Sequence, residues 1–140
     1  MSGELTQEEL CDFLEFVQKL EMLEPPDRTW VLRQREKPVI CYETMTGKEI
    51  SERFRAFELA RIGTTFSAFR ERLGENFPKA IERNLTECCA FVSSALCDQH
   101  DYGTWPPPGY AKRIGVILRK AKRKDLSDRF DAAYSKLIVE

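Results

Sequence analysis

The stretch NFPKAIERNLTECCAFVSSALC, residues 76–97, decides the fold class of this 140-residue chain. Its apolar side chains recur three or four positions apart, which is the spacing of one face of an α-helix. Asn76 is a good helix-capping residue and Pro78 is tolerated in a first helical turn, so we expect one continuous helix here. Its predicted buried face consists of Phe77, Ile81, Leu85, Cys88, Val92 and Leu96.

Residues 6–24 predict a second helix with a clear beginning and end. Thr6 and Glu9 have the spacing of a capping box, in which each side chain accepts a hydrogen bond from the other residue's backbone N–H. Pro25 then ends the helix because proline lacks a backbone N–H. The side chains expected to face the core are Leu10, Phe13, Leu14, Val17 and Leu20.

The same periodicity predicts four further helices over residues 51–62, 65–73, 110–122 and 126–138. Gly63 and Gly74 are the expected C-terminal ends of the first two, since glycine readily adopts the backbone conformation that closes a helix. The last helix is expected to bury Leu126, Phe130, Tyr134 and Leu137.

Residues 29–43 change pattern. Trp30 to Arg33 and Val39 to Tyr42 are short stretches rich in β-branched or aromatic side chains, which favour strands. We therefore predict a small β-hairpin near residues 29–43. The expected fold is mainly α, a single domain over residues 1–140 built as a bundle of about six helices.

Composition indicates an ordinary globular protein. Hydrophobic residues make up 42% of the chain and charged residues 32%, and no apolar run is long enough to cross a membrane. The first ten residues are polar and acidic, unlike a secretory signal peptide. Five cysteines, an odd number without regular spacing, fit a reducing compartment. We expect a cytoplasmic protein, with a nuclear location also open.

Charge is distributed unevenly along the chain. The net charge is −1, but residues 1–27 hold eight acidic residues and one basic residue. The remainder holds 15 acidic and 21 basic residues. This acidic N-terminal helix could form a semi-independent element or fold back over the basic part and mask it. Such segregation predicts either an internal contact or separate partners for the two charged surfaces.

The strongest candidate binding element is the helix after Tyr110. Its aliphatic side chains fall on one side and its basic side chains on the other. A helix that presents several positive charges can bind nucleic-acid phosphates, because each neutralised phosphate releases counterions. A simple solvated helix face is the alternative. The candidate residues are Lys112, Arg113, Arg119, Lys120, Arg123 and Lys124.

Residues 57–74, FELARIGTTFSAFRERLG, resemble the helix-turn-helix segments of DNA-binding proteins. Gly63 would take the turn of such a motif, and Phe69 and Leu73 would take buried positions. The chain departs from that pattern at Leu59, where a small residue is usual, and at Thr64, where an apolar one is usual. The residues that the resemblance places where a recognition helix faces DNA are Thr65, Phe66, Ser67, Arg70 and Arg72.

The segment WPPPGY, residues 105–110, is a second candidate for docking. Three consecutive prolines favour a polyproline II turn, and Trp105 and Tyr110 could enter an aromatic groove on a partner protein. The alternative is a stiff connection between helices in which Trp105 packs on the core.

Catalytic and metal-binding patterns are weak. Cys88, Cys89, Cys97 and His100 are the only cysteine–histidine cluster. Cys88 and Cys97 lie nine residues apart on one expected helix, about 13 Å along its axis, which is too far to share one ion. His100 is the only histidine, and nothing in the sequence positions it as a catalytic base. We expect neither a metal, nor a cofactor, nor enzymatic activity.

Two functional hypotheses remain. The first is a small regulatory protein that binds DNA or RNA through the basic helix. The second is a helical protein–protein interaction module or inhibitor that uses its charge-segregated surfaces without nucleic acid. The stretch AKRIGVILRKAKRKDLSDRF, residues 111–130, resembles the terminal helices of death-fold adaptor domains, which act through protein contacts. Neither hypothesis fixes an oligomeric state.

Overall fold

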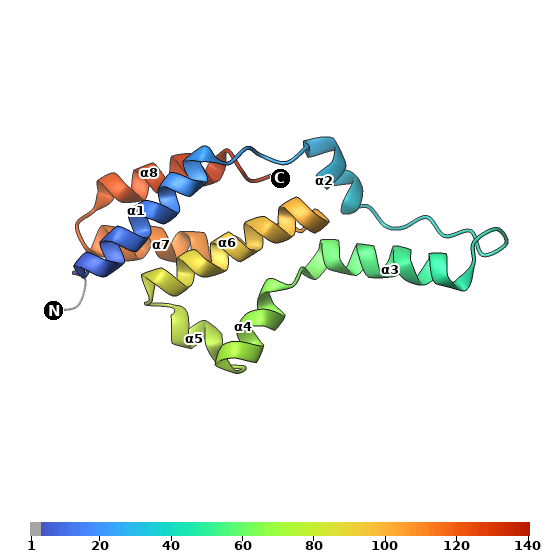
Figure 1. Cartoon of the computed structure of the whole chain (residues 1–140), viewed down its shortest axis with the longest axis horizontal. Coiled ribbons are helices and arrows are strands. Elements are labelled where there is room, and N and C mark those ends of the chain that lie inside the picture. Colours follow the sequence, from blue (N-terminus) through green and yellow to red (C-terminus); the bar gives the residue numbers. More distant parts are fainter. Residues whose placement is uncertain (1–3) are drawn as a thin grey trace.

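The computed structural model describes residues 4–140, and over that range the chain forms eight helices and no strand (Figure 1). The mainly α fold class is therefore confirmed, with more helices than the expected six. None of the described helices is long and apolar enough to cross a membrane. The helices are α1 (Gln7–Met22), α2 (Arg28–Gln34), α3 (Gly47–Ile62), α4 (Thr65–Leu73), α5 (Phe77–Ile81), α6 (Leu85–Tyr102), α7 (Pro108–Lys120) and α8 (Lys124–Ser135).

The main body of the molecule consists of α1, α6, α7 and α8. Helix α6 packs against α1 and α7, and α8 packs against the same two helices. Acidic α1 and basic α7 therefore lie diagonally across the group. The expected apolar faces are confirmed as the core, which includes Phe13, Val17, Leu20, Leu85, Cys88, Val92, Leu96, Ile114, Leu118, Leu126, Phe130 and Leu137.

Helices α4 and α5 form a short pair beside α6 with an aromatic cluster of its own. The rings of Phe69 and Phe77 lie 5.1 and 6.3 Å from the ring of Phe91, measured between centroids. Tyr110 of α7 contacts the same ring, with centroids 3.9 Å apart. Because Phe91 is fully buried, its side chain joins α4, α5 and α7 to α6.

The predicted β-hairpin is wrong. Residues 28–34 form helix α2 instead, and Asp27 begins it by accepting hydrogen bonds from the backbone N–H groups of Thr29 and Trp30. A helix N-cap satisfies backbone groups locally, whereas an isolated two-stranded hairpin is marginal without a third strand or a packed face. Val31 then buries its side chain completely, which strand propensity alone could not indicate.

The single helix expected over residues 76–97 is also wrong, because the chain breaks at residues 82–84. The Asn84 side chain accepts a hydrogen bond from the backbone N–H of Glu87 at 3.0 Å and begins α6 anew. Asn followed three residues later by Glu is a helix-start signal within the stretch itself. The apolar spacing continues across the break, so periodicity did not reveal it.

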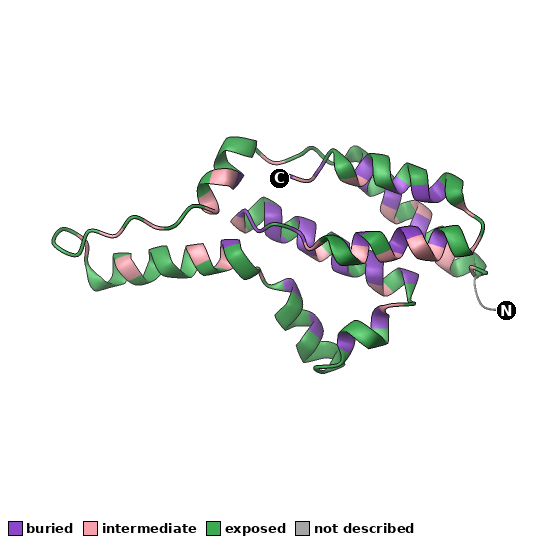
Figure 2. Cartoon of the chain, turned by 180° about the vertical axis from the view of Figure 1, so that it is seen from behind, coloured by how far each residue is buried: buried purple, intermediate pink, exposed green. Residues whose placement is uncertain are grey.

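Residues 35–62 form an arm that projects from the body and consists of an irregular segment followed by α3 (Figure 1). Helix α3 buries only Ala60, near the end where it meets α6. Figure 2 shows most of the arm as exposed. Val39 and Tyr42 are 78% and 74% exposed, so the arm presents apolar side chains to solvent.

The turn between the arm and α4 is anchored by a buried carboxylate. One oxygen of Asp98 accepts hydrogen bonds from the backbone N–H groups of Thr64 and Thr65 and from the Thr65 hydroxyl. The other oxygen accepts a bond from the Thr64 hydroxyl at 2.7 Å. Asp98 on α6 thus begins α4 from a distant part of the sequence, in place of a local cap.

Candidate nucleic-acid interface

Helix α7 is held in the body by one side and exposes the other. Its first turn begins at Pro108, where the missing N–H costs nothing because that group has no helical partner. Ala111, Ile114, Gly115 and Leu118 face inward between α6 and α8. The opposite side is basic and open to solvent, as the amphipathic pattern predicts.

The exposed lysines of this region carry free positive charge. Among the described residues, Lys112, Lys120 and Lys122 are exposed and form no ion pair. Lys124 and Arg123 differ, since they pair with Asp128 and Asp125. Hydrogen bonding to those carboxylates raises the pKa of both basic groups, so they remain charged but are locally neutralised.

Two arginines of α7 are positioned by neutral oxygen atoms and keep their full charge. Arg113 donates to the backbone carbonyl of Glu82 at 3.0 Å, and Arg119 donates to the hydroxyl of Ser127 at 3.2 Å. A side chain at Gly115 would approach the Arg119 guanidinium to 3.0 Å, so glycine makes room for it. Both guanidiniums are therefore oriented without losing their charge.

The contact of Arg113 with Glu82 adds basic residues that sequence reasoning missed. It brings the turn between α5 and α6 beside α7, where Lys79 at the end of α5 and Arg83 in the turn are exposed. Glu82, the acidic residue between them in sequence, is half-buried and contacts Arg113 through its backbone carbonyl. Lys79 and Arg83 are distant from α7 in sequence and belong to no recognisable charge pattern. Only the fold brings them near the basic helix.

The residues that the helix-turn-helix resemblance singles out differ in burial, and some face the interior while others face solvent. Gly63 takes the turn with a φ of +63°, and α3 and α4 both pack on α6. Thr65 is buried and its hydroxyl binds Asp98, so it faces the interior. Ser67 and Arg70 are exposed. The resemblance stays a prediction.

Arg72 is engaged by its neighbours on the outside of α4. Its guanidinium pairs with Glu87 and lies 5.0 Å from the centre of the Phe69 ring. Leu73, given a buried position by the helix-turn-helix resemblance, is 37% exposed. Because its guanidinium is already paired, Arg72 is less available than Arg70 to bind a phosphate.

The proline segment is a stiff connection, but its buried residue differs from the one expected. Pro106 is fully buried, whereas Trp105 is 51% exposed. Tyr110 is half-buried against Phe91. Trp105 and Phe66 line the same groove as an exposed aromatic pair.

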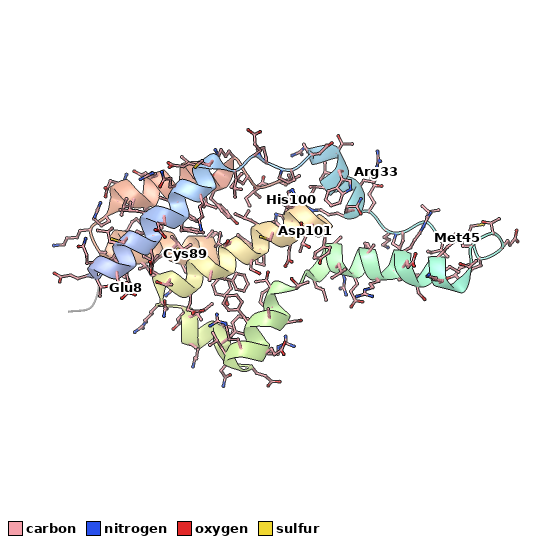
Figure 3. All side chains as sticks on the ribbon, in the orientation of Figure 1. Glu8, Arg33, Met45, Cys89, His100 and Asp101 are labelled. Atoms are coloured by element: carbon pink, nitrogen blue, oxygen red, sulfur yellow. The ribbon has the colours of Figure 1, made fainter. Side chains whose placement is uncertain are left out.

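The cysteine–histidine cluster is spread along α6. Cys88 and Cys89 are buried in the core, and burial raises the pKa of the Cys88 thiol to about 11 and raises the pKa of Cys89 further. Figure 3 shows His100 and Asp101 at the far end of α6 from Cys89. Within residues 4–140, no group of three potential ligands is arranged to hold a metal ion.

The described surface thus combines a basic helix, two basic neighbours and an exposed aromatic pair, with acidic α1 on the diagonally opposite helix. Such a charge distribution attracts a polyanion to one side and repels it from the other. Neither a protein-family model nor a curated protein matches the chain, and no solved structure does either.

Proposed function

We propose that this protein binds nucleic acid through the basic surface of α7, as a small regulatory protein without catalytic activity. The observation that carries the proposal is the set of uncompensated positive charges on and next to that helix. Lys112, Lys120 and Lys122 are free of ion pairs among the described residues, and Arg113 and Arg119 bond only to neutral oxygens. Phosphate groups are the ligands that such clustered positive charges favour.

The position of α1 supports the same reading. An acidic helix packed over α7 would cancel its potential, but α1 packs on α6 and α8. Near the end of α1, the Glu21 carboxylate accepts a hydrogen bond from Arg129 of α8. The Glu21 backbone carbonyl accepts another from Lys136, which directly follows α8. The acidic helix α1 therefore leaves α7 accessible. Its negative charge also repels a polyanion from the side of the molecule where α1 lies.

Charge reversal on α7 tests the proposal. In the variant K112E/K120E/K122E, three free charges are inverted at exposed positions that make no described ion pair. We expect fluorescence anisotropy with a labelled 20-nucleotide strand or duplex to show at least about 100-fold weaker binding at 0.1 M salt, since each lost phosphate contact removes counterion release.

A matched control lies on the arm. The variant K37E/K48E/R55E makes the same change of net charge at exposed residues away from α7. It should lower affinity far less, because charges beyond about 10 Å are largely screened at 0.1 M salt. Equal loss in both variants would mean that only net charge matters and would contradict a binding surface on α7.

A protein-interaction role has one observation in its favour. The arm exposes Val39, Tyr42 and Phe54, and the last of these is 47% exposed on a helix with a single buried residue. Exposed apolar clusters are common at protein–protein contacts. If the main partner is retained in a pull-down after nuclease treatment, and is lost in V39S/Y42S, this second function is favoured over the first.

A further inference from the structure

We infer that the groove between Phe66 and Trp105 receives an unstacked base of a single-stranded nucleic acid. The inference rests on the proposed function and specifies the kind of nucleic acid that the protein binds. It assigns the phosphates of the strand to α7 and one base to the groove.

The groove is formed where the end of α3, the beginning of α4 and the proline segment meet above α6. It has a volume of about 180 Å³, and Ile62, Phe66, Trp105 and Pro107 contribute apolar walls. Phe66 is 39% exposed and Trp105 is 51% exposed, so both rings are open to a ligand. Aromatic side chains that remain this exposed beside a hollow offer stacking surfaces for flat groups.

The buried end of the groove favours a base over a phosphate. Asp98 lies in its lining, 5% exposed, and its carboxylate accepts all four of its hydrogen bonds from Thr64 and Thr65. A phosphate placed there would meet a like charge in a poorly hydrated site, which is unfavourable. A base presents a neutral π-face to the rings, and every base carries a ring or exocyclic N–H group that can donate to an acceptor.

The shape of the groove favours a single strand. In a duplex the bases are stacked and paired, so they reach such a slot only after unstacking, which costs a few kcal/mol. Single strands already expose their bases, and proteins that bind them combine aromatic platforms with a positively charged track. Arg61 in the lining of the groove and the basic residues of α7 supply that charge.

The groove and the basic helix are close enough to share one strand. Trp105 precedes Pro108, the first residue of α7, by three positions, and Lys112 follows one turn later. Extended and helical rises give a separation of at most about 16 Å between Trp105 and Lys112, a span of a few nucleotides. Packing also joins the two sites, because Phe66 and Tyr110 both contact Phe91, at 5.3 and 3.9 Å between ring centroids.

Tryptophan fluorescence tests the inference directly. The chain has two tryptophans, so the variant W30F leaves Trp105 as the only one. Titration of this variant with dT12 or U12 should quench Trp105 fluorescence, since a base stacks on the ring, and the two oligomers separate DNA from RNA. A duplex of the same length should bind more weakly and quench less.

Substitution of the aromatic ring measures its contribution. We expect W105A to bind the single strand about 5- to 150-fold more weakly than the parent, the range for the loss of one stacked base. W105F should recover most of the affinity because it keeps an aromatic face. Trp105 is half exposed, so thermal unfolding of W105A should match that of the parent and exclude a folding defect.

The outcomes separate this inference from the proposed function. Salt-dependent binding of dT12 or U12 without quenching, and with unchanged affinity in W105A, would overturn the groove assignment and leave binding at α7 intact. Absence of binding to every oligonucleotide would overturn both. Quenching by a proline-rich peptide, with none by dT12 or U12, would also contradict the inference and indicate a protein ligand.

Discussion

Replacement of Asp98 by asparagine should destabilise the whole protein, although the side chains have nearly the same size. The carboxylate of Asp98 accepts four hydrogen bonds from Thr64 and Thr65, and the residue is 5% exposed. Hydrogen bonds to an ionised acceptor are about twice as strong as those between neutral groups. Asparagine also replaces one acceptor oxygen by a donor NH₂ group.

The expected loss can be worked out bond by bond. If each of the four hydrogen bonds weakens by about 0.5–1 kcal/mol on loss of the charge, the free energy of unfolding falls by about 2–4 kcal/mol. An unfolding entropy of about 2.1 cal/mol/K per residue then gives a fall in Tm of about 7–14 °C for a chain of this length.

Urea denaturation followed by circular dichroism measures this change. D101N provides the matched control, because Asp101 lies one turn further along α6 and bonds only to the exposed His100. It should change stability by less than about 0.5 kcal/mol. Hydrogen exchange should locate the effect of D98N at the start of α4. If D98N unfolds at the same urea concentration as D101N, the anchoring role given to Asp98 is refuted.

Three further predictions concern the core, one ion pair and one turn. Ellman's reagent should react quickly with three thiols in the native protein and with Cys88 and Cys89 only on unfolding, because these two are buried. A hydrogen bond from Arg129 lowers the pKa of Glu21, so this pair should stabilise the fold above the ordinary glutamate pKa. That contribution is lost as pH falls through the lowered value, and R129Q should raise the Glu21 midpoint in an NMR titration. Gly63→Ala should cost at least about 1 kcal/mol in thermal unfolding, since φ is +63° and a Cβ would collide with Asp98.

Local patterns predicted the helices because their information lies within one or two turns. The capping box of Thr6 and Glu9 is present, with bonds of 3.0 Å in both directions. The apolar stripe of α6 is buried as expected, since a period of 3.6 residues identifies a helix face whatever it packs against. The basic side of α7 is exposed for the same reason.

Features that depend on distant residues could not be predicted in this way. The start of α4 depends on Asp98, which lies more than 30 residues further along the chain. Lys79 and Arg83 join the basic surface through one contact of Arg113 with a backbone carbonyl. Trp105 and Pro106 could each have packed inward, and the choice depends on the shape of the core rather than on hydrophobicity.

The predictions of secondary structure were wrong where two local signals competed. Val31 and its neighbours favour a strand by side-chain type, but Asp27 provides a helix cap immediately before them. The cap prevails because a helix forms its backbone hydrogen bonds within the segment and Asp27 accepts two of the remaining N–H groups, whereas a strand needs a partner that this segment lacks. At Asn84 the cap likewise overrides a continuous apolar period.

The salt dependence of binding tests the central claim most directly. Five uncompensated charges on and next to α7 predict that log K for a 20-nucleotide single strand falls with log salt at a slope of about −3.5. Affinity should therefore drop about 100-fold between 50 and 200 mM salt. In K112E/K120E/K122E the slope should be about −1.4 or shallower. A wild-type slope near zero, or no binding at 50 mM salt, would contradict nucleic-acid binding by α7.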